Sequence, residues 1–261
     1  MKIYTWDEFC EHSPYKAQPV SMTLGVFDGL HLGHCRLMEE LESGPGNIPL
    51  VFTFRRNPAE IMNPKTFAGN ILTLDQKLER MQNLGVKGAI IIDFSHDFSK
   101  LTGIEFFSRI LDRSKLKKVV LGENHRLGNR GETGAGEVKT FLEKDGVFVK
   151  IVHSLKENGG VISSTRIREL IKSGKLSEAS DLLGYPFSLD LRRLVPEHTD
   201  GMFRVPREKC LQLLPPAGSY KAGIEENQEF FATKLILDNQ YIQWNQNSDI
   251  PAKKIIFSYS D

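Results

Sequence analysis

The hydrophobic pattern changes character once along this chain. Up to about residue 185, short apolar runs alternate with segments in which apolar residues recur every three or four positions. The runs predict buried strands, and the recurring positions predict amphipathic helices. We expect strands at Val20–Phe27, Ile48–Phe54, Gly88–Phe94, Lys117–Gly122 and Phe148–His153. We expect helices at His34–Ser43, 74–84, Ile104–Leu111, Gly136–Lys144, Thr165–Ser173 and Ser177–Leu183.

Strand–helix alternation of this kind predicts an α/β fold, with a parallel sheet covered by helices on both faces. Ligands of such sheets usually bind beyond the carboxyl ends of the strands, where the strand order reverses. Residues that directly follow a predicted strand are therefore the first candidates for a functional site.

The pattern after Pro186 lacks helical periodicity. It consists of strand-like runs separated by turn residues, at Met202–Val205, Gly218–Gly223, Glu229–Leu237, Tyr241–Trp244 and Lys254–Tyr259. This succession predicts a small antiparallel β domain that follows the α/β domain in the sequence.

Composition narrows the function classes. The 261 residues include 34 Lys+Arg and 33 Asp+Glu, and this near-zero net charge argues against a protein that coats nucleic acid or a membrane surface. Cys10, Cys35 and Cys210 are scattered, so we expect no disulfide framework or zinc site, and a cytoplasmic location. The N-terminal segment lacks the apolar core of a signal peptide, and no apolar run reaches the ~18 residues of a membrane span.

A segment rich in glycine and histidine follows the first predicted strand and opens a helix: GVFDGLHLGH, Gly25–His34. Glycines permit tight turns and a close approach of phosphates, and helix amides add partial positive charge. The imidazoles of His31 and His34 can point at one ligand and stabilise charge on a phosphoryl group. Read alone, the histidines could fill a turn or bind a metal. Strand, glycine turn, HxGH and helix together favour a nucleotide site.

A second segment, ISSTRIR at Ile162–Arg168, also joins a strand to a helix. Ser163, Ser164 or Thr165 can cap that helix, and their hydroxyls can also hold phosphate oxygens. Arg168 can reach the far end of a nucleotide. A capped helix with solvent-facing arginines is an equally weighted alternative.

Two more segments follow predicted strands. In GENHRLG, at Gly122–Gly128, Asn124 could hydrogen-bond a phosphate without adding charge, although a solvated loop is favoured for this segment alone. In TFRRNP, at Thr53–Pro58, Arg55 and Arg56 could face an anionic ligand or be exposed. No paired carboxylates, Ser/His/Asp order or Cys/His nucleophile stands out.

Together these segments resemble the adenylyltransferase module of bacterial FAD synthetase, the bifunctional riboflavin kinase/FMN adenylyltransferase family, which belongs to the HxGH nucleotidylyltransferases. Gly25–His34 matches the family's first motif without a break. Residues 162–187 (ISSTRIRELIKSGKLSEASDLLGYPF) resemble its second motif, and Gly122–Asn124 resembles the middle motif, G-x-(D/N)-F-x-F-G. The resemblance implies a Rossmann-like nucleotidylyltransferase domain with a parallel sheet over residues 1–187.

The chain departs from the family pattern in three places. The proline-histidine pair of the family's T-F-x-P-H-P is replaced by Arg56-Asn57, and His125 and Leu127 stand where the middle motif has aromatics. The kinase module's glycine-rich stretch, ending in G-F-P-T-A-N, does not occur after Pro186. We therefore expect residues 188–261 to be a remnant of the riboflavin kinase barrel without kinase activity.

By resemblance, the chain is a nucleotidyltransferase that makes FAD and pyrophosphate from FMN and ATP. The resemblance implies catalytic roles for His31, His34, Asn124 and Arg168. It implies ATP or phosphate contacts from Gly25, Phe27, Asp28, Gly29, Gly33, Ser163, Ser164 and Thr165. It implies FMN contacts from Thr53, Arg56, Asn57, Asn124 and His125. Mg²⁺ would be held mainly by the substrate phosphates.

Two alternatives stay open. The altered Arg56-Asn57 pair motivates another HxGH nucleotidylyltransferase, with a different phosphate acceptor or with CTP. The altered motifs and the shortened tail motivate a non-catalytic flavin- or nucleotide-binding protein, which would release no pyrophosphate. We expect small-molecule ligands, no nucleic-acid or membrane partner, and a monomer, although the sequence leaves the oligomeric state open.

Overall fold

The structure is a computed structural model that describes residues 1–42, 46–95, 97–157, 159–199, 201–226, 229–246 and 251–258. Ser43 and Tyr259, which two predicted elements include, lie outside these residues. The chain divides into two compact units, residues 1–67 with 77–161 and residues 68–76 with 162–261. No helix among the described residues is long and apolar enough to cross a membrane.

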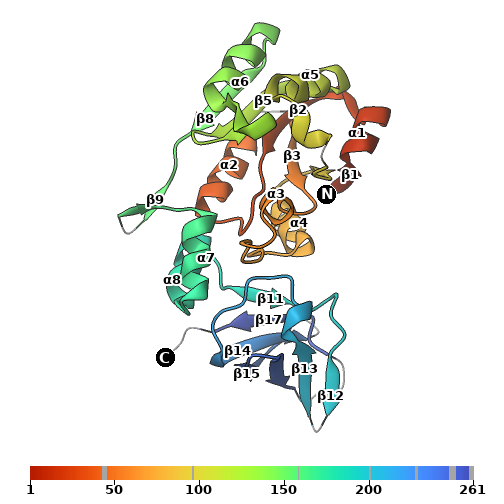
Figure 1. Cartoon of the computed structure of the whole chain (residues 1–261). Coiled ribbons are helices and arrows are strands. Elements are labelled where there is room, and N and C mark those ends of the chain that lie inside the picture. The colour runs from red at the N-terminus through yellow and green to blue at the C-terminus, as the bar shows by residue number, and fades with distance from the viewer. Residues whose placement is uncertain are drawn as a thin grey trace. The chain divides into compact units, whose positions relative to one another are not determined.

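A six-stranded parallel sheet forms the centre of the first unit (Figure 1). In spatial order its strands are β1 (Lys2–Thr5), β4 (Gly88–Ile92), β3 (Ile48–Phe54), β2 (Tyr15–Leu24), β5 (Ser114–Gly122) and β8 (Phe148–Val152). All neighbouring pairs run parallel. The predicted parallel α/β sheet is confirmed, and its apolar runs are strands buried on both faces.

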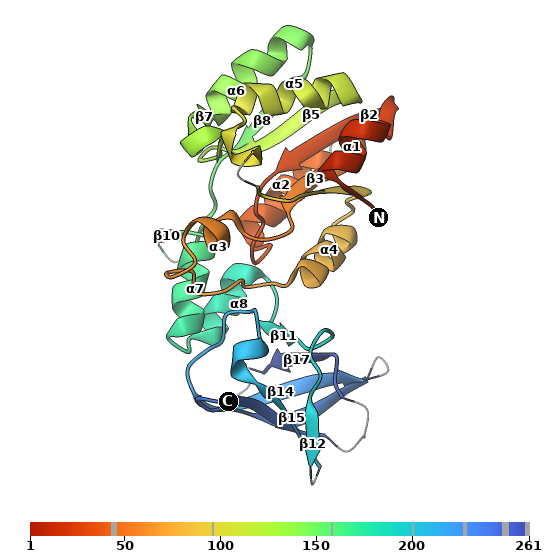
Figure 2. The same ribbon diagram turned by 45° about the vertical axis from the view of Figure 1, so that its right-hand side comes forward.

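Helices cover both faces of this sheet (Figures 1 and 2). On one face α5 (Gly103–Arg113) packs between α1 (Trp6–His12) and α6 (Ala135–Leu142), and on the other α2 (Leu32–Glu42) lies against β2, β3 and β5. Successive side chains of each strand point to opposite faces of the sheet, so one strand packs against both helix layers. Met22 joins the core that contains Phe106 of α5, whereas the Ser21 hydroxyl donates a 3.0 Å hydrogen bond to the Leu41 carbonyl of α2.

The second unit contains a seven-stranded sheet in which all neighbouring pairs are antiparallel. In spatial order its strands are β11 (Ser188–Asp190), β17 (Lys254–Phe257), β14 (Gly218–Glu226), β15 (Glu229–Leu237), β16 (Tyr241–Asn245), β13 (Met202–Pro206) and β12 (Glu197–Thr199). The predicted antiparallel β domain is confirmed. Two helices precede this sheet, α7 (Ser164–Lys172) and α8 (Leu176–Leu183).

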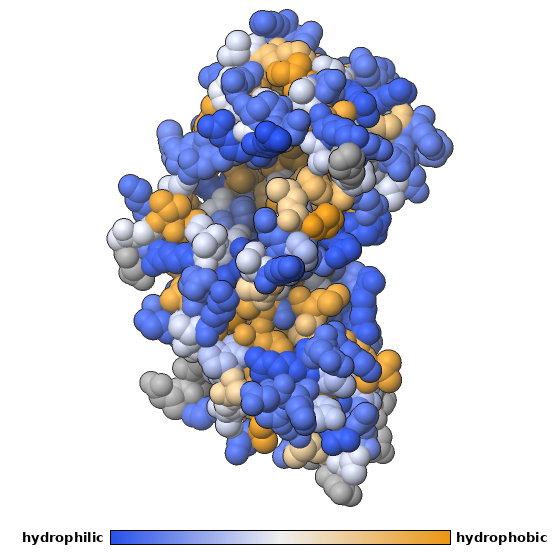
Figure 3. Space-filling model, in the orientation of Figure 1, coloured by the Kyte–Doolittle hydropathy of each residue, from blue (hydrophilic) through white to orange (hydrophobic). Residues whose placement is uncertain are grey.

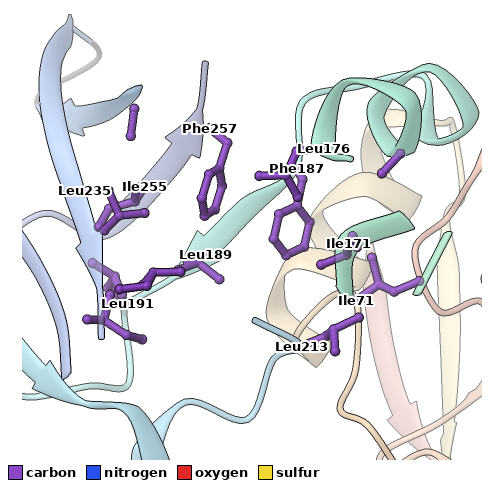
Figure 4. Close-up of a cluster of buried hydrophobic side chains, with 14 of the residues drawn as sticks. Ile71, Ile171, Leu176, Phe187, Leu189, Leu191, Leu213, Leu235, Ile255 and Phe257 are labelled. Carbon is purple, nitrogen blue, oxygen red and sulfur yellow. The ribbon is translucent and has the colours of Figure 1, made fainter. Parts of the chain in front are cut away.

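One hydrophobic core joins α7 and α8 to the antiparallel sheet (Figure 4). Ile171 of α7 and Leu176 of α8 share it with Leu189 of β11, and Phe187 stacks on Phe257 of β17 with ring centroids 5.4 Å apart. Because these helices bury their apolar faces within the second unit, the compact units do not divide at residue 187. The functional domains 1–187 and 188–261 remain a prediction.

Several elements differ from the sequence prediction. The strand expected to reach Phe27 ends at Leu24, because the following residues form a turn, and the helix expected from His34 begins at Leu32. Four further elements are too short to be predicted from a hydrophobic pattern: β1, α1, β11 and β12. The remaining helices and strands are α3 (Pro58–Met62), α4 (Leu74–Asn83), β6 (Arg126–Leu127), β7 (Thr133–Gly134), β9 (Lys156–Glu157), β10 (Gly160–Val161) and 3₁₀ turns at Phe98–Lys100, Asn129–Gly131, Glu143–Asp145 and Arg207–Lys209.

The face shown in Figure 3 is mostly hydrophilic, with hydrophobic residues in small groups. Among the described residues, the most exposed large apolar side chains are Met62, Val195, Leu211 and Phe230. Single exposed apolar side chains are ordinary on protein surfaces.

Candidate functional site

The parallel sheet reverses its strand order between β2 and β5. From β2 the chain proceeds to β3 and β4 on one side, and then to β5 and β8 on the other. Ligands of open α/β sheets bind in the crevice beyond the carboxyl ends of strands at such a reversal. The segments that follow these two strands are Gly25–His31 and Glu123–His125. The fold therefore places the first and middle motifs at the same edge of the sheet, at the carboxyl ends of two neighbouring strands.

The turn after β2 has an unusual backbone. Phe27, Gly29 and Leu30 have φ values of 52°, 83° and 36°, in the left-handed region that glycine adopts readily and other residues rarely. Phe27 is buried, and its ring fills the space beside Gly25, where an added Cβ would come within 3.0 Å of ring carbon. Asp28 is also buried. Residues that hold such strain cluster at functional sites because the surrounding structure must enforce it.

His31 and His34 lie together at the start of α2. The rings stack with centroids 3.7 Å apart and an interplanar angle of 16°, and Phe27 meets His34 edge-on at 5.2 Å. The His34 amide lies 3.3 Å from Nδ1 of His31 and donates to it, which places the proton of a neutral His31 ring on Nε2. The His31 carbonyl accepts from the amides of His34 and Cys35, so this residue caps the helix. Gly33, between the two, lies in the first turn of α2.

Both imidazoles are uncharged at neutral pH. Burial lowers the pKa of His31 to about 4. Burial, followed by the charges of His31 and Lys77, lowers the pKa of His34 well below its ordinary value. The sequence predicts two imidazoles that stabilise charge on a phosphate. The neutral rings can stabilise a phosphate by donating hydrogen bonds to it. The negative charge of a bound phosphate would in turn raise the pKa of both histidines.

The sequence prediction missed Lys77, which lies on α4. Its ammonium donates to the Val26 carbonyl at 3.1 Å, the Thr53 hydroxyl at 3.0 Å and the Phe54 carbonyl at 3.0 Å. Burial lowers the pKa of Lys77 to about 8, and the Asp28 carboxylate opposes that shift. The ammonium therefore stays mostly protonated at neutral pH. One signal could have revealed this residue: it falls on the apolar stripe of its helix.

The end of β3 and the segment after it are engaged in contacts within the fold. Thr53 is fully buried, and its hydroxyl donates to the Val26 carbonyl at 3.2 Å. Asn57 caps α3 by accepting a 3.0 Å hydrogen bond from the Ala59 amide. The exposed Arg56 pairs with Glu60 at 2.7 Å. Direct FMN contacts from Thr53, Arg56 and Asn57 stay predictions.

The segment after β5 joins the end of β8. The exposed Asn124 amide donates to the Ser154 hydroxyl at 3.1 Å, and the Glu123 carboxylate contacts Nδ1 of His153 at 2.6 Å. Hydrogen bonds from His153 and Ser154 hold the pKa of Glu123 at about 2. Burial lowers the pKa of His125 to about 4, and among the described residues no hydrogen-bond partner reaches its buried Nε2. The predicted roles of Asn124 and His125 stay predictions.

The ISSTRIR segment belongs to the second unit. Ser163 caps α7, and its hydroxyl accepts a 3.3 Å hydrogen bond from the Arg166 amide. Thr165 is exposed and Ser164 half-buried, both in the first turn of α7. One turn later, Nε of Arg168 lies 3.4 Å from the Gly69 carbonyl, to which it donates. Two hydroxyls and an arginine thus lie near one helix N-terminus, an arrangement able to bind an anion.

A metal cage built by the protein is not evident. Among the described residues, no three His, Cys, Asp or Glu side chains are grouped so that they could hold a metal ion.

Comparison with known sequences identifies the family. The sequence pattern of FAD synthetase matches residues 13–166, more than half of the chain. The chain belongs to the FAD synthetase family. The matched range contains the turn after β2, the histidine pair, the segment after β5 and the start of α7, and it ends at Arg166. The resemblance noted from the motifs is confirmed.

Individual relatives of the family extend beyond this chain. The bifunctional riboflavin kinase/FMN adenylyltransferase of Listeria monocytogenes is 34% identical over 172 residues, which cover 64% of this chain and 54% of that protein. The Escherichia coli protein of the same name is 29% identical over 175 residues, covering 66% and 56%. The chain thus spans little more than half the length of these curated relatives.

A solved structure of similar fold comes from Streptococcus pneumoniae, where it is named a macrolide-efflux protein. Its TM-score to this chain is 0.84 at 23% identity, covering 98% of this chain and 89% of that one. At this identity the similarity concerns the fold alone. The parallel sheet with its helices, followed by an antiparallel sheet, therefore occurs in a solved structure.

Proposed function

We propose that the chain is an FMN adenylyltransferase, which converts FMN and ATP to FAD and pyrophosphate. The observation that carries this proposal is the stacked histidine pair at the strand-order reversal, in a chain of the FAD synthetase family. The Listeria and E. coli relatives bear the name of this activity. Its ligands are then small molecules, and we propose no nucleic-acid or membrane partner.

The reaction joins two phosphates. An oxygen of the FMN phosphate attacks the α-phosphorus of ATP, a new P–O–P bond forms, and the bond between the α-phosphorus and the bridging oxygen to the β-phosphorus breaks. Pyrophosphate leaves with that oxygen. No covalent enzyme intermediate is needed, so the protein contributes positioning and charge stabilisation. His31 and His34 donate hydrogen bonds to ATP oxygens near the α-phosphorus.

The other motif residues bind or orient the remaining phosphates. Ser164, Thr165 and Arg168 bind the β- and γ-phosphates, for which the N-terminal turn of α7 is suited. Asn124 helps to orient the reacting phosphates. Mg²⁺ enters as part of the ATP substrate, neutralises phosphate charge, and keeps most of its waters.

One observation favours a second candidate. Arg56 stands where the family has proline, and its guanidinium is exposed. If a ligand displaces Glu60, with which Arg56 pairs at 2.7 Å, this guanidinium would favour an acceptor with more negative charge than FMN. The second candidate is therefore adenylyl transfer to another phosphate acceptor by the same site.

Substitution of the histidine pair tests the proposal. The protein is incubated with MgATP and FMN, and FAD and pyrophosphate are quantified. His31→Ala and His34→Ala should each lower kcat by about 10²–10³-fold, the usual loss for one preorganised stabilising group. His12→Ala, at an exposed histidine at the end of α1, is the matched control and should keep kcat unchanged.

The outcomes separate the candidates. Equimolar FAD and pyrophosphate from the native chain support the proposal. Pyrophosphate with a different adenylylated product, when other acceptors are supplied, would support the second candidate. Normal FAD formation by both histidine variants would remove the assigned role of the pair.

A further inference from the structure

Lys77 places a buried ammonium beside the turn after β2. The residue is 7% exposed, and a buried charge costs free energy that an apolar side chain of similar volume would not. Leu74, Leu78 and Met81 occupy the neighbouring positions of the same helical stripe. Packing alone would therefore favour a fourth apolar residue here, and the position calls for another explanation.

The contacts of the ammonium supply that explanation. Its three protons match three oxygens: the carbonyls of Val26 and Phe54 and the Thr53 hydroxyl, at 3.0–3.1 Å. Thr53 in turn donates to the same Val26 carbonyl. Val26 therefore accepts from two donors directly before Phe27, where the backbone enters the left-handed region. The lysine ties the turn to the end of β3.

This arrangement also determines what the lysine cannot do. Because all three protons are used within the protein, none is available for a direct bond to a phosphate. Its influence on a ligand must pass through the turn and through its charge, which the Asp28 carboxylate stabilises and which helps to lower the pKa of His34.

We propose that Lys77 is a positioning residue for phosphate transfer: it holds the turn Val26–Leu30 in the strained conformation that presents His31 and His34 to the nucleotide. The inference rests on the proposed function and extends it to a residue outside the recognised motifs. Thr53 has the same positioning role, because its hydroxyl accepts from the Lys77 ammonium and donates to the Val26 carbonyl of the turn.

The test compares two buried lysines of the first unit. Lys77→Met removes the tie, and Lys118→Met is the matched control. Lys118 is 6% exposed, and its ammonium donates to the Glu40 carbonyl near the end of α2, away from the turn. Both variants remove a donor from partly buried carbonyl oxygens, so both should lose thermal stability although methionine carries no buried charge. Only Lys77→Met should lower kcat for FAD formation, by about 10–100-fold, because small displacements of reacting groups cost this much.

The Michaelis constants distinguish positioning from a general structural effect. For Lys77→Met we expect KM for FMN to stay within about threefold of the native value while kcat falls, at a temperature where both variants remain folded. Thr53→Val keeps the side-chain volume but removes the hydroxyl that links Lys77 to Val26, and should lower kcat by about three- to tenfold. Native kcat in either Lys77→Met or Thr53→Val would overturn the inference, as would an equal loss in Lys118→Met.

ATP binding separates this inference from the proposed function. If the native chain binds ATP in calorimetry but forms no FAD, the proposed function fails while the lysine can still be tested. Lys77→Met should then weaken ATP binding by about tenfold, and Lys118→Met should not. Equal ATP affinity in the two variants would overturn the positioning role by itself. If Lys77→Met does not fold, Thr53→Val gives the same comparison.

Discussion

At the scale of single residues, the candidate site depends on polar groups kept in an apolar environment. His31 and His34 are neutral because burial disfavours their charged forms, whereas Lys77 keeps its charge because three oxygens and a nearby carboxylate stabilise it. A site of this kind can accept a polyanion without first losing a competing salt bridge. It should also make the folded state sensitive to pH.

The stability of the fold should fall between pH 6.5 and about 4. In that range the unfolded chain protonates His31, whose ordinary pKa is 6.5, while the folded chain, with a pKa of about 4, does not. The unfolded state then binds more protons, so acid favours unfolding by up to about 1.4 kcal/mol per pH unit for one histidine. Urea denaturation at pH 7 and pH 5 measures this loss, which His31→Gln should reduce.

The exposed His12 supplies the control for this pH effect. His12→Gln should lose as much stability between pH 7 and pH 5 as the native chain. An unchanged pH dependence in His31→Gln would show that its ring is not the group responsible.

The histidine pair could be predicted from sequence, whereas the contacts of Lys77 could not. Glycines, histidines and a helix start lie within ten consecutive residues, so the local pattern alone identifies the turn. Lys77 reaches Val26 and Thr53 across 51 and 24 residues, and only the parallel pairing of β2 and β3 brings those oxygens together. Its position on an apolar stripe was the sole local indication.

At the scale of elements, long apolar runs were predictable and short segments were not. Ile48–Phe54 forms β3 with the predicted bounds, because seven mostly buried residues give an unambiguous signal. The four residues of β1 and the three of β11 carry too little pattern. Helix α3 illustrates the same limit, because its start is decided by a cap and not by periodicity.

The Asn57 cap should be measurable. Asn57→Ala removes the acceptor for the Ala59 amide and should lower the free energy of unfolding by about 1 kcal/mol. Asn57→Asp keeps an acceptor and should keep the stability. Urea denaturation provides the comparison. If Asn57→Asp raises KM for FMN while stability is unchanged, the side chain has a role in flavin binding besides the cap.

At the scale of the whole molecule, the second unit includes a segment from far upstream. Gln212 is buried, and its amide donates to the Ile71 carbonyl at 2.9 Å and to Gln76 and the Ser188 carbonyl at 3.1 Å. Its oxygen accepts from the Asp190 amide at 2.7 Å. One side chain thus connects residues 68–76 to the antiparallel sheet, a pairing that no sequence periodicity predicts.

Loss of this amide should destabilise the second unit. Gln212→Leu removes the hydrogen bonds that this side chain makes to several buried groups, and we expect a loss of about 2–4 kcal/mol, since each buried polar group that loses its partner costs ~1–3 kcal/mol. Gln240→Leu, at an exposed position of the same unit, should change stability by less than about 0.5 kcal/mol. Urea denaturation measures both, and equal stability of the two variants would contradict the importance of the Gln212 contacts.

The second unit should also lack the kinase activity that the relatives' name includes. Residues 188–261 contain no glycine-rich stretch like that of the kinase module, so the loop chemistry for a second phosphate transfer is missing. With riboflavin and MgATP, chromatography should detect no FMN above the enzyme-free control. FMN accumulation would mean that this unit has a phosphate site of another design.

Adenylyl transfer to FMN can be followed with labelled ATP. The native protein is incubated with FMN and ATP that carries radioactive phosphorus at either the α or the γ position, and the products are separated. We expect the α label in FAD and the γ label in pyrophosphate, because the α-phosphorus is transferred and the β- and γ-phosphates leave. FAD without α label, or α label only in a product that is not a flavin, would contradict adenylyl transfer to FMN.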